Sequence, residues 1–210
     1  MVVDIGLMGC KMDDWYEIIH DPNKDIYQKF DEQVDNFRQW SRTIKLEFEW
    51  EESFPNWQLI YTIFDTLIET TTYEMWNQRT VNNLLFIIGR DNESELLMSK
   101  IAEYPGALLF LGREGITYTD CDTKWQLAHY LAECFSDHPD VEEIILKYYE
   151  DDNEYVKRRA LLALGIIKSK YAEQCALESW GTGMKYQRLA ALEVLKQLNS
   201  LYYFKLKKLL

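Results

Sequence analysis

Between residues 141 and 167, apolar side chains recur every three or four positions, with a polar turn at 151–153 between two such runs. This spacing gathers residues on one face of an α-helix. The two stripes are Val141, Ile144, Ile145, Tyr148 and Tyr149, and then Val156, Ala160, Ala163, Leu164 and Ile167. The sequence therefore predicts a hairpin of two amphipathic helices, and the alanines let a neighbouring helix approach closely.

Similar stripes predict further helices upstream. The first predicted helix covers residues 25–37, the second begins at Pro55 and stops near residue 70, and the third covers residues 73–89. Asn92 and Glu95 have the spacing of a capping box, which predicts a helix that ends at Pro105, and Asp122 is expected to cap the next one. Residues 44–54 alternate apolar and acidic side chains, which predicts either an extended segment or a helix end. Residues 1–24 and 107–119 carry no clear pattern.

An internal repeat of 31 residues relates the hairpin to the segment that follows it. At this offset the apolar positions of residues 141–149 fall on those of 172–180. The same offset places Tyr155, Ala160 and Leu164 on Tyr186, Ala191 and Leu195. One offset serves both helices, which indicates a repeat architecture in which neighbouring pairs stack. Towards the N-terminus the repeat needs a one-residue slip and becomes weak.

The run from Asp151 to Gly165, D-x-N-x-x-V-K-x-x-A-x-x-A-L-G, resembles the second-helix signature of HEAT repeats. That resemblance implies an all-α, HEAT-like α-solenoid, in which antiparallel helix pairs stack into a right-handed superhelix. It also implies that the polar residues of the motif form a ladder between repeats and do not bind a ligand. The ladder residues so assigned are Asp151, Asn153, Lys157 and Arg188.

The expected organisation is a single all-α domain spanning residues 1–210. An irregular N-terminal helical cap would cover residues 1–70, and degenerate repeats would cover 72–135. The clearest repeats would be 138–167 and 168–198, followed by a C-terminal cap at 199–210.

Charge is divided unevenly along the chain. Residues 1–152 contain 12 Lys and Arg against 31 Asp and Glu, a net charge of −19, whereas residues 153–210 contain 11 against 4, a net charge of +7. The negative charge of residues 1–152 favours a basic protein partner and disfavours nucleic acid binding. An excess of acidic residues is, however, also common among proteins of the cytosol. The basic C-terminal stretch keeps a HEAT-like DNA glycosylase open as an alternative function.

The predicted function is a non-enzymatic protein-binding scaffold, and by analogy of size and charge a bacterial immunity protein that neutralises a basic toxin. A structural adaptor without a toxin is the other alternative. Carboxylates on the second helices and in residues 47–51 would steer a basic partner, and aromatic residues would anchor it. The predicted partner-binding residues are Asp120, Asp122, Trp125, Glu154, Tyr155, Arg158 and Tyr186, with Glu47, Glu49 and Glu51 as further steering carboxylates.

No catalytic, cofactor or metal site is predicted. The sequence has no glycine-rich phosphate loop and no G-x-S-x-G nucleophile motif. Cys121, His129, Cys134 and His138 form the most metal-like group, but their spacing does not fit known zinc motifs. Four scattered cysteines, the lack of a long apolar run and the lack of a signal-peptide pattern lead us to expect a cytoplasmic protein with no membrane span. The oligomeric state is left open.

Overall fold

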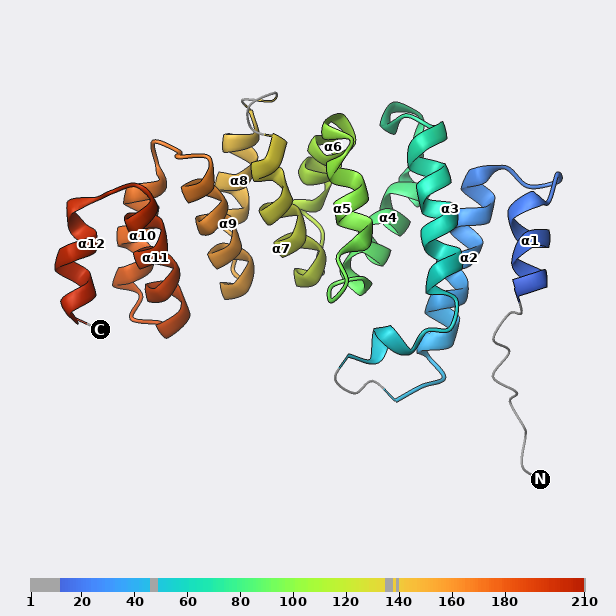
Figure 1. Cartoon of the computed structure of the whole chain (residues 1–210), viewed down its shortest axis with the longest axis horizontal. Helices are drawn as coiled ribbons and strands as arrows, with labels where there is room; N and C mark the ends of the chain where they lie inside the picture. Colours follow the sequence, from blue (N-terminus) through green and yellow to red (C-terminus); the bar gives the residue numbers. More distant parts are fainter. Residues whose placement is uncertain (1–11, 46–48, 135–137, 139, 210) are drawn as a thin grey trace. The chain divides into compact units, whose positions relative to one another are not determined.

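The computed structural model describes residues 12–45, 49–134, 138 and 140–209, and every element among them is helical (Figure 1). The prediction of an all-α fold is therefore confirmed. The helices group into two compact units, residues 1–87 and 88–210, and the expected organisation as a single domain stays a prediction.

The first unit is built around helices α2 and α3, which pack against each other. Its elements are α1 (Met12–His20), α2 (Ile26–Ser41), a 3₁₀ helix (Trp50–Ser53), α3 (Trp57–Thr70), a second 3₁₀ helix (Tyr73–Met75) and most of α4 (Gln78–Arg90). Phe37 lies at the centre of a group of aromatic rings, with its own ring centroid 4.9 Å from that of Phe54 and 5.3 Å from that of Trp57. The buried carboxylate of Asp31 accepts a 2.6 Å hydrogen bond from Asn83, which ties α2 to α4.

The second unit consists of successive helix pairs. Its elements are α5 (Leu96–Ala102), α6 (Pro105–Gly115), α7 (Cys121–Tyr130), a 3₁₀ helix (Leu131–Cys134), α8 (Val141–Tyr149), α9 (Glu154–Ile166), α10 (Ala172–Gly181), α11 (Lys185–Gln197), α12 (Leu201–Leu206) and a last 3₁₀ helix (Lys207–Leu209). Helix α9 packs against α8, its partner in the predicted hairpin, and also against α7 and α11. The predicted stripe of α9 is buried from Val156 to Leu164.

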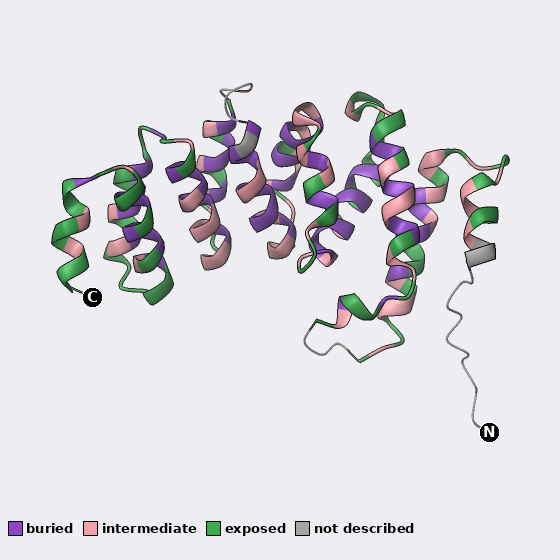
Figure 2. Ribbon diagram, in the orientation of Figure 1, coloured by how far each residue is buried: buried purple, intermediate pink, exposed green. Residues whose placement is uncertain are grey.

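Side chains with hydroxyl groups connect the first helices of successive pairs. The hydroxyl of Tyr148 is buried and donates to the carbonyl of Gly112 on α6 at 2.8 Å. The hydroxyl of Tyr149 donates to the carbonyl of Cys175 on α10, also at 2.8 Å. Adjacent tyrosines of α8 therefore bond to the helices on either side of it, and buried residues form bands along most helices of this unit (Figure 2).

The spacing of 31 residues recurs in the backbone. Two residues after the end of α9, Lys168 adopts the left-handed region at φ 51°, and two residues after the end of α11, Asn199 does the same at φ 54°, 31 positions later. In both places the following serine N–H donates to a carbonyl five residues back, Ser169 to Leu164 and Ser200 to Leu195, each at 2.9 Å. This is the Schellman geometry of a helix C-terminus. Each serine hydroxyl then accepts an N–H two residues on, which begins the next element.

Several predicted helix boundaries are wrong. The Asn92–Glu95 capping box is absent, because Glu95 itself adopts φ 52° just before α5 and Asp91 accepts the N–H of Leu97 instead. Asp120 caps α7 in place of Asp122, accepting the N–H groups of residues 122 and 123.

Further differences concern helix starts and the segments that were left unassigned. Pro105 begins α6 where the sequence analysis ended a helix, since a proline without an N–H is also suited to a first helical turn. Helix α3 begins at Trp57, two residues after Pro55, and α4 begins at Gln78 after a 3₁₀ turn. Within the unassigned residues 1–24 the structure contains α1. The described part of residues 44–54 includes a 3₁₀ helix, and Leu46, Glu47 and Phe48 lie outside the described residues.

Candidate binding surface

Four of the seven predicted partner-binding residues form a continuous row across α7, α9 and α11. The rings of Trp125 and Tyr155 meet edge to face with centroids 5.4 Å apart. The guanidinium of Arg158 lies 4.6 Å from the centroid of the Tyr155 ring and 5.0 Å from that of Tyr186. The three helices that carry these residues are neighbours, α9 lying against both α7 and α11.

Two further cations belong to this row and were missed by the sequence analysis. Arg159 lies 4.7 Å above the ring of Trp125, and Lys185 lies 5.5 Å from the ring of Tyr186. A cation over an aromatic face is attracted by about 0.5–1 kcal/mol at exposed sites. We call these six residues the arginine–aromatic row: Trp125, Tyr155, Arg158, Arg159, Lys185 and Tyr186. Trp125 is buried, the three residues of α9 are half-buried, and Lys185 and Tyr186 are exposed.

The predicted acidic residues of this surface are paired within the chain. Arg90 at the end of α4 lies 2.5 Å from Asp120 and 3.6 Å from Asp122. The carboxylate of Glu154 lies 3.9 Å from the guanidinium of Arg158, one turn along α9. Because these carboxylates already face cations, the surface that they share with the row has a cationic and aromatic character. Of the other steering carboxylates, Glu51 is buried and Glu49 is exposed, both in the first unit, and Glu47 lies outside the described residues.

The predicted ladder residues have different contacts. Asp151 forms an ion pair with Lys124 on α7, with 2.7 Å between Nζ and Oδ2, and both side chains are about 15% exposed. Its other oxygen accepts the N–H of Asn153, whose own side chain caps α9. Lys157 does not reach this aspartate and lies 5.5 Å from the ring of Tyr149.

Arg188 contacts the preceding helix. Its Nε donates to the carbonyl of Trp180 at 3.3 Å, and its guanidinium lies 5.2 Å from that ring. The turn before α11 has Thr182 where the previous repeat has Asp151, and its hydroxyl accepts the N–H of Met184 in the same manner. An aspartate therefore joins α7 to α9, and no equivalent carboxylate stands in the turn before α11. Lys124 was missed by the sequence analysis, because the enclosure of Asp151 beside α7 depends on how the helices pack.

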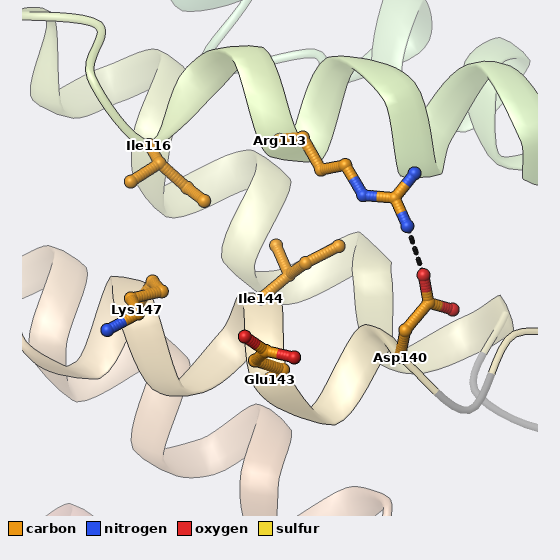
Figure 3. Close-up of a pocket in the computed structure, with 6 residues that line it drawn as sticks. All are labelled: Arg113, Ile116, Asp140, Glu143, Ile144 and Lys147. Carbon is orange, nitrogen blue, oxygen red and sulfur yellow. Dashed lines mark hydrogen bonds and ion pairs between the residues drawn. The ribbon is translucent and has the colours of Figure 1, made fainter.

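A separate cleft of about 420 Å³ lies beside α6 and α8 (Figure 3). Its apolar wall is formed by Ile116 and Ile144, and its rim includes an ion pair between Arg113 and Asp140. Because this arginine is already paired with a carboxylate, the rim is electrically mixed and favours no single class of ligand.

Cys121, His129, Cys134 and His138, the most metal-like residues of the sequence, lie within the described part of the chain. Among the described residues, no group of three or more His, Cys, Asp or Glu side chains could hold a metal ion. Burial raises the pKa of the Cys121 thiol, and Asp122 and Asp120 raise it further, so this thiol stays protonated near neutral pH. Burial and the charge of Arg159 lower the pKa of His129, which keeps this imidazole neutral beside the row.

Comparison with known protein families, with curated proteins and with solved structures found no match for this chain. Across the residues described, no helix has the length and apolar character needed to cross a membrane.

Proposed function

We propose that this protein is a non-enzymatic scaffold that binds another protein on the surface formed by α7, α9 and α11. The observation that carries the proposal is the arginine–aromatic row, in which aromatic anchors from three neighbouring helices lie side by side. Tyr, Trp and Arg are the residues most enriched at the energetic centres of protein interfaces.

The proposed architecture behind this surface is a HEAT-like right-handed solenoid. Its support is the recurrence of the helix pair and of its terminal Schellman turn at 31 residues, together with the contacts of α9 to both α7 and α11. In such an arrangement each second helix contributes an equivalent strip of surface, and a partner contacts several strips at once.

The proposed partner is a basic protein, and the more specific form of the proposal is an immunity protein against a basic toxin. Its support is the net charge of −12, with −19 in residues 1–152. A field of this sign accelerates the encounter with a cationic protein and does so less as salt increases. The steering and the final contacts need not involve the same residues, because steering acts over about a Debye length.

The test is to measure association with basic proteins encoded beside this chain, by surface plasmon resonance at increasing ionic strength. We expect a complex whose association rate falls steadily with salt, while its dissociation rate changes little. Tyr186→Ala, which removes an exposed anchor, should speed dissociation. A complex that forms at the same rate at all salt concentrations contradicts the steering argument. Tight binding of duplex DNA by the isolated protein would instead support the glycosylase alternative.

A further inference from the structure

We propose that the arginine–aromatic row is a docking site for an acidic segment of a protein, with one carboxylate on Arg158 and a second on Arg159. The inference rests on the proposed function as a protein-binding scaffold, but it assigns a contact chemistry opposite to the net charge of the chain. A partner that is basic overall can still present acidic residues at this place.

The first argument is the way in which the two guanidinium groups are held. Arg158 is within 5.0 Å of the ring centroids of Tyr155 and Tyr186, and Arg159 is within 4.7 Å of that of Trp125. Contacts with rings restrict the rotation of a long side chain before any ligand binds, so less conformational entropy is lost on binding. Since these contacts involve ring faces, they leave the N–H donors of the guanidinium edge for oxygen acceptors.

The second argument is that the hydrogen-bonding capacity of this site is incompletely used. In the part of the chain that the structure describes, the Nε atoms of Arg158 and Arg159 and one oxygen of Glu154 are buried and have no hydrogen-bond partner. Glu154 lies 3.9 Å from Arg158, too far for a hydrogen bond, and no described carboxylate forms an ion pair with Arg159. The two unsatisfied Nε donors call for an acceptor from a ligand or from ordered water, and a carboxylate suits a guanidinium best. The oxygen of Glu154 is an acceptor and needs a donor instead.

The third argument is the local charge. Helix α9 carries three cations and one carboxylate, and α11 has the same balance. Residues 153–210 as a whole have a net charge of +7. Every residue of the row except Trp125 lies in this basic part of the sequence, whose charge complements an acidic ligand, and Lys185 of the row is exposed.

An acidic protein segment fits this site better than a nucleic acid. A salt-sensitive nucleic acid complex usually rests on about 6–10 phosphate contacts, and the row offers two guanidinium groups and one lysine. A longer polyanion would also be repelled by the net charge of −19 that residues 1–152 carry. A short segment with two or three carboxylates gains the local attraction and avoids most of that repulsion.

The experiment is a calorimetric titration of the full chain with an acetylated and amidated peptide of four Glu-Asp repeats at low ionic strength. A peptide of four Gln-Asn repeats is the neutral control. Arginine Nε–Hε correlation spectra, recorded during the titration, identify which guanidinium groups respond. We expect the acidic peptide alone to bind, with the signals of Arg158 and Arg159 shifting first.

Variants separate the guanidinium geometry from bulk charge. Arg158→Gln and Arg159→Gln should each weaken binding by about 10-fold or more, since hydrogen bonds to charged groups are the strong ones. Arg158→Lys keeps the charge but loses the planar donor group, and should lose most of the same affinity. Lys196→Gln, at an exposed position further along α11, removes the same charge and should change binding less than about 2-fold. Circular dichroism melting confirms that each variant is folded.

Four results would overturn the inference. The acidic peptide could bind no better than the neutral one, or the variants of Arg158 could match Lys196→Gln. Tripolyphosphate or a single-stranded oligothymidylate could displace the peptide and bind more tightly, which would assign the row to phosphate. A protein complex that forms and is unaffected by Arg158→Gln and Arg159→Gln would leave the proposed function standing and still overturn this site.

Discussion

The ion pair between Lys124 and Asp151 should couple α7 to the turn before α9 by more than an ordinary surface ion pair. The two charged atoms are 2.7 Å apart and their side chains are 15% and 14% exposed. The perturbation is a double-mutant cycle of Lys124→Met and Asp151→Asn. Asparagine keeps the acceptor that holds the N–H of Asn153, so the turn itself should persist.

The expected magnitude follows from the burial of the pair. Hydrogen bonds to charged groups contribute about 1.5–3 kcal/mol, whereas exposed ion pairs contribute about 0.2–1 kcal/mol. With so little exposure, and with desolvation opposing the attraction, we expect a coupling free energy of about 1.5–2 kcal/mol. Each single variant should cost at least as much, because it leaves one charge or one acceptor without its partner.

Hydrogen exchange measured by mass spectrometry gives the free energy of opening for peptides from α7 and α9, so the effect is localised to these helices. The matched control is the pair Lys147 and Glu150, which is 3.2 Å apart but 51% and 66% exposed. Its cycle should give less than about 0.5 kcal/mol. If the two cycles give the same coupling, burial does not strengthen the inner pair and the reasoning fails.

Three further predictions concern packing, backbone strain and pH. Gly165→Ala should destabilise the second unit by about 1–2 kcal/mol in urea unfolding, because its Cβ would lie 2.7–2.8 Å from side chains of α11; Gly181→Ala, with nothing within 4 Å, should not destabilise it. Lys168→Gly should stabilise by about 0.5–1 kcal/mol, seen as a higher melting temperature, since the lysine has φ 51°; an unchanged or lower value contradicts this. Burial raises the pKa of Tyr149 to about 12 and that of Cys175 to about 11, so the folded state holds these protons longer than the unfolded chain. The free energy of unfolding should therefore be unchanged below about pH 9 and fall between about pH 9 and 12. In Cys175→Ala the fall at the lower end of this range should be shallower, as measured by urea unfolding at a series of pH values.

The helical class was predictable because it depends on patterns within single helices. The stripe of α9 was identified from spacing alone, and its residues from Val156 to Leu164 are buried. Helix starts were harder, because several residues near each start can cap. Asp120 and Asp122 are both suitable by type, and only the path of the backbone decides that Asp120 accepts the first N–H groups. Pro105 can likewise end one helix or begin the next.

The candidate surface was predictable only in part, for a related reason. The equivalence of Tyr155 and Tyr186 followed from the 31-residue offset, and it correctly suggested that both lie at the starts of second helices. Arg159 and Lys124 were missed because their partners lie on a neighbouring helix. Which residue meets which across two helices depends on their lateral shift and rotation, and the periodicity of one helix contains no information on either.

Because matched serines follow α9 and α11, whole helix pairs can be added or removed at these points without a change in the turns. After each helix the chain passes through one residue in the left-handed conformation and forms an equivalent backbone hydrogen bond. The hydroxyls of Ser169 and Ser200 then accept equivalent N–H groups at the start of the next element. A genetic crossover between these two points would add or delete one helix pair while both junctions kept their backbone path. Duplication of residues 169–199 should therefore yield a longer folded protein, and lineages could vary the length of this surface without designing a new turn.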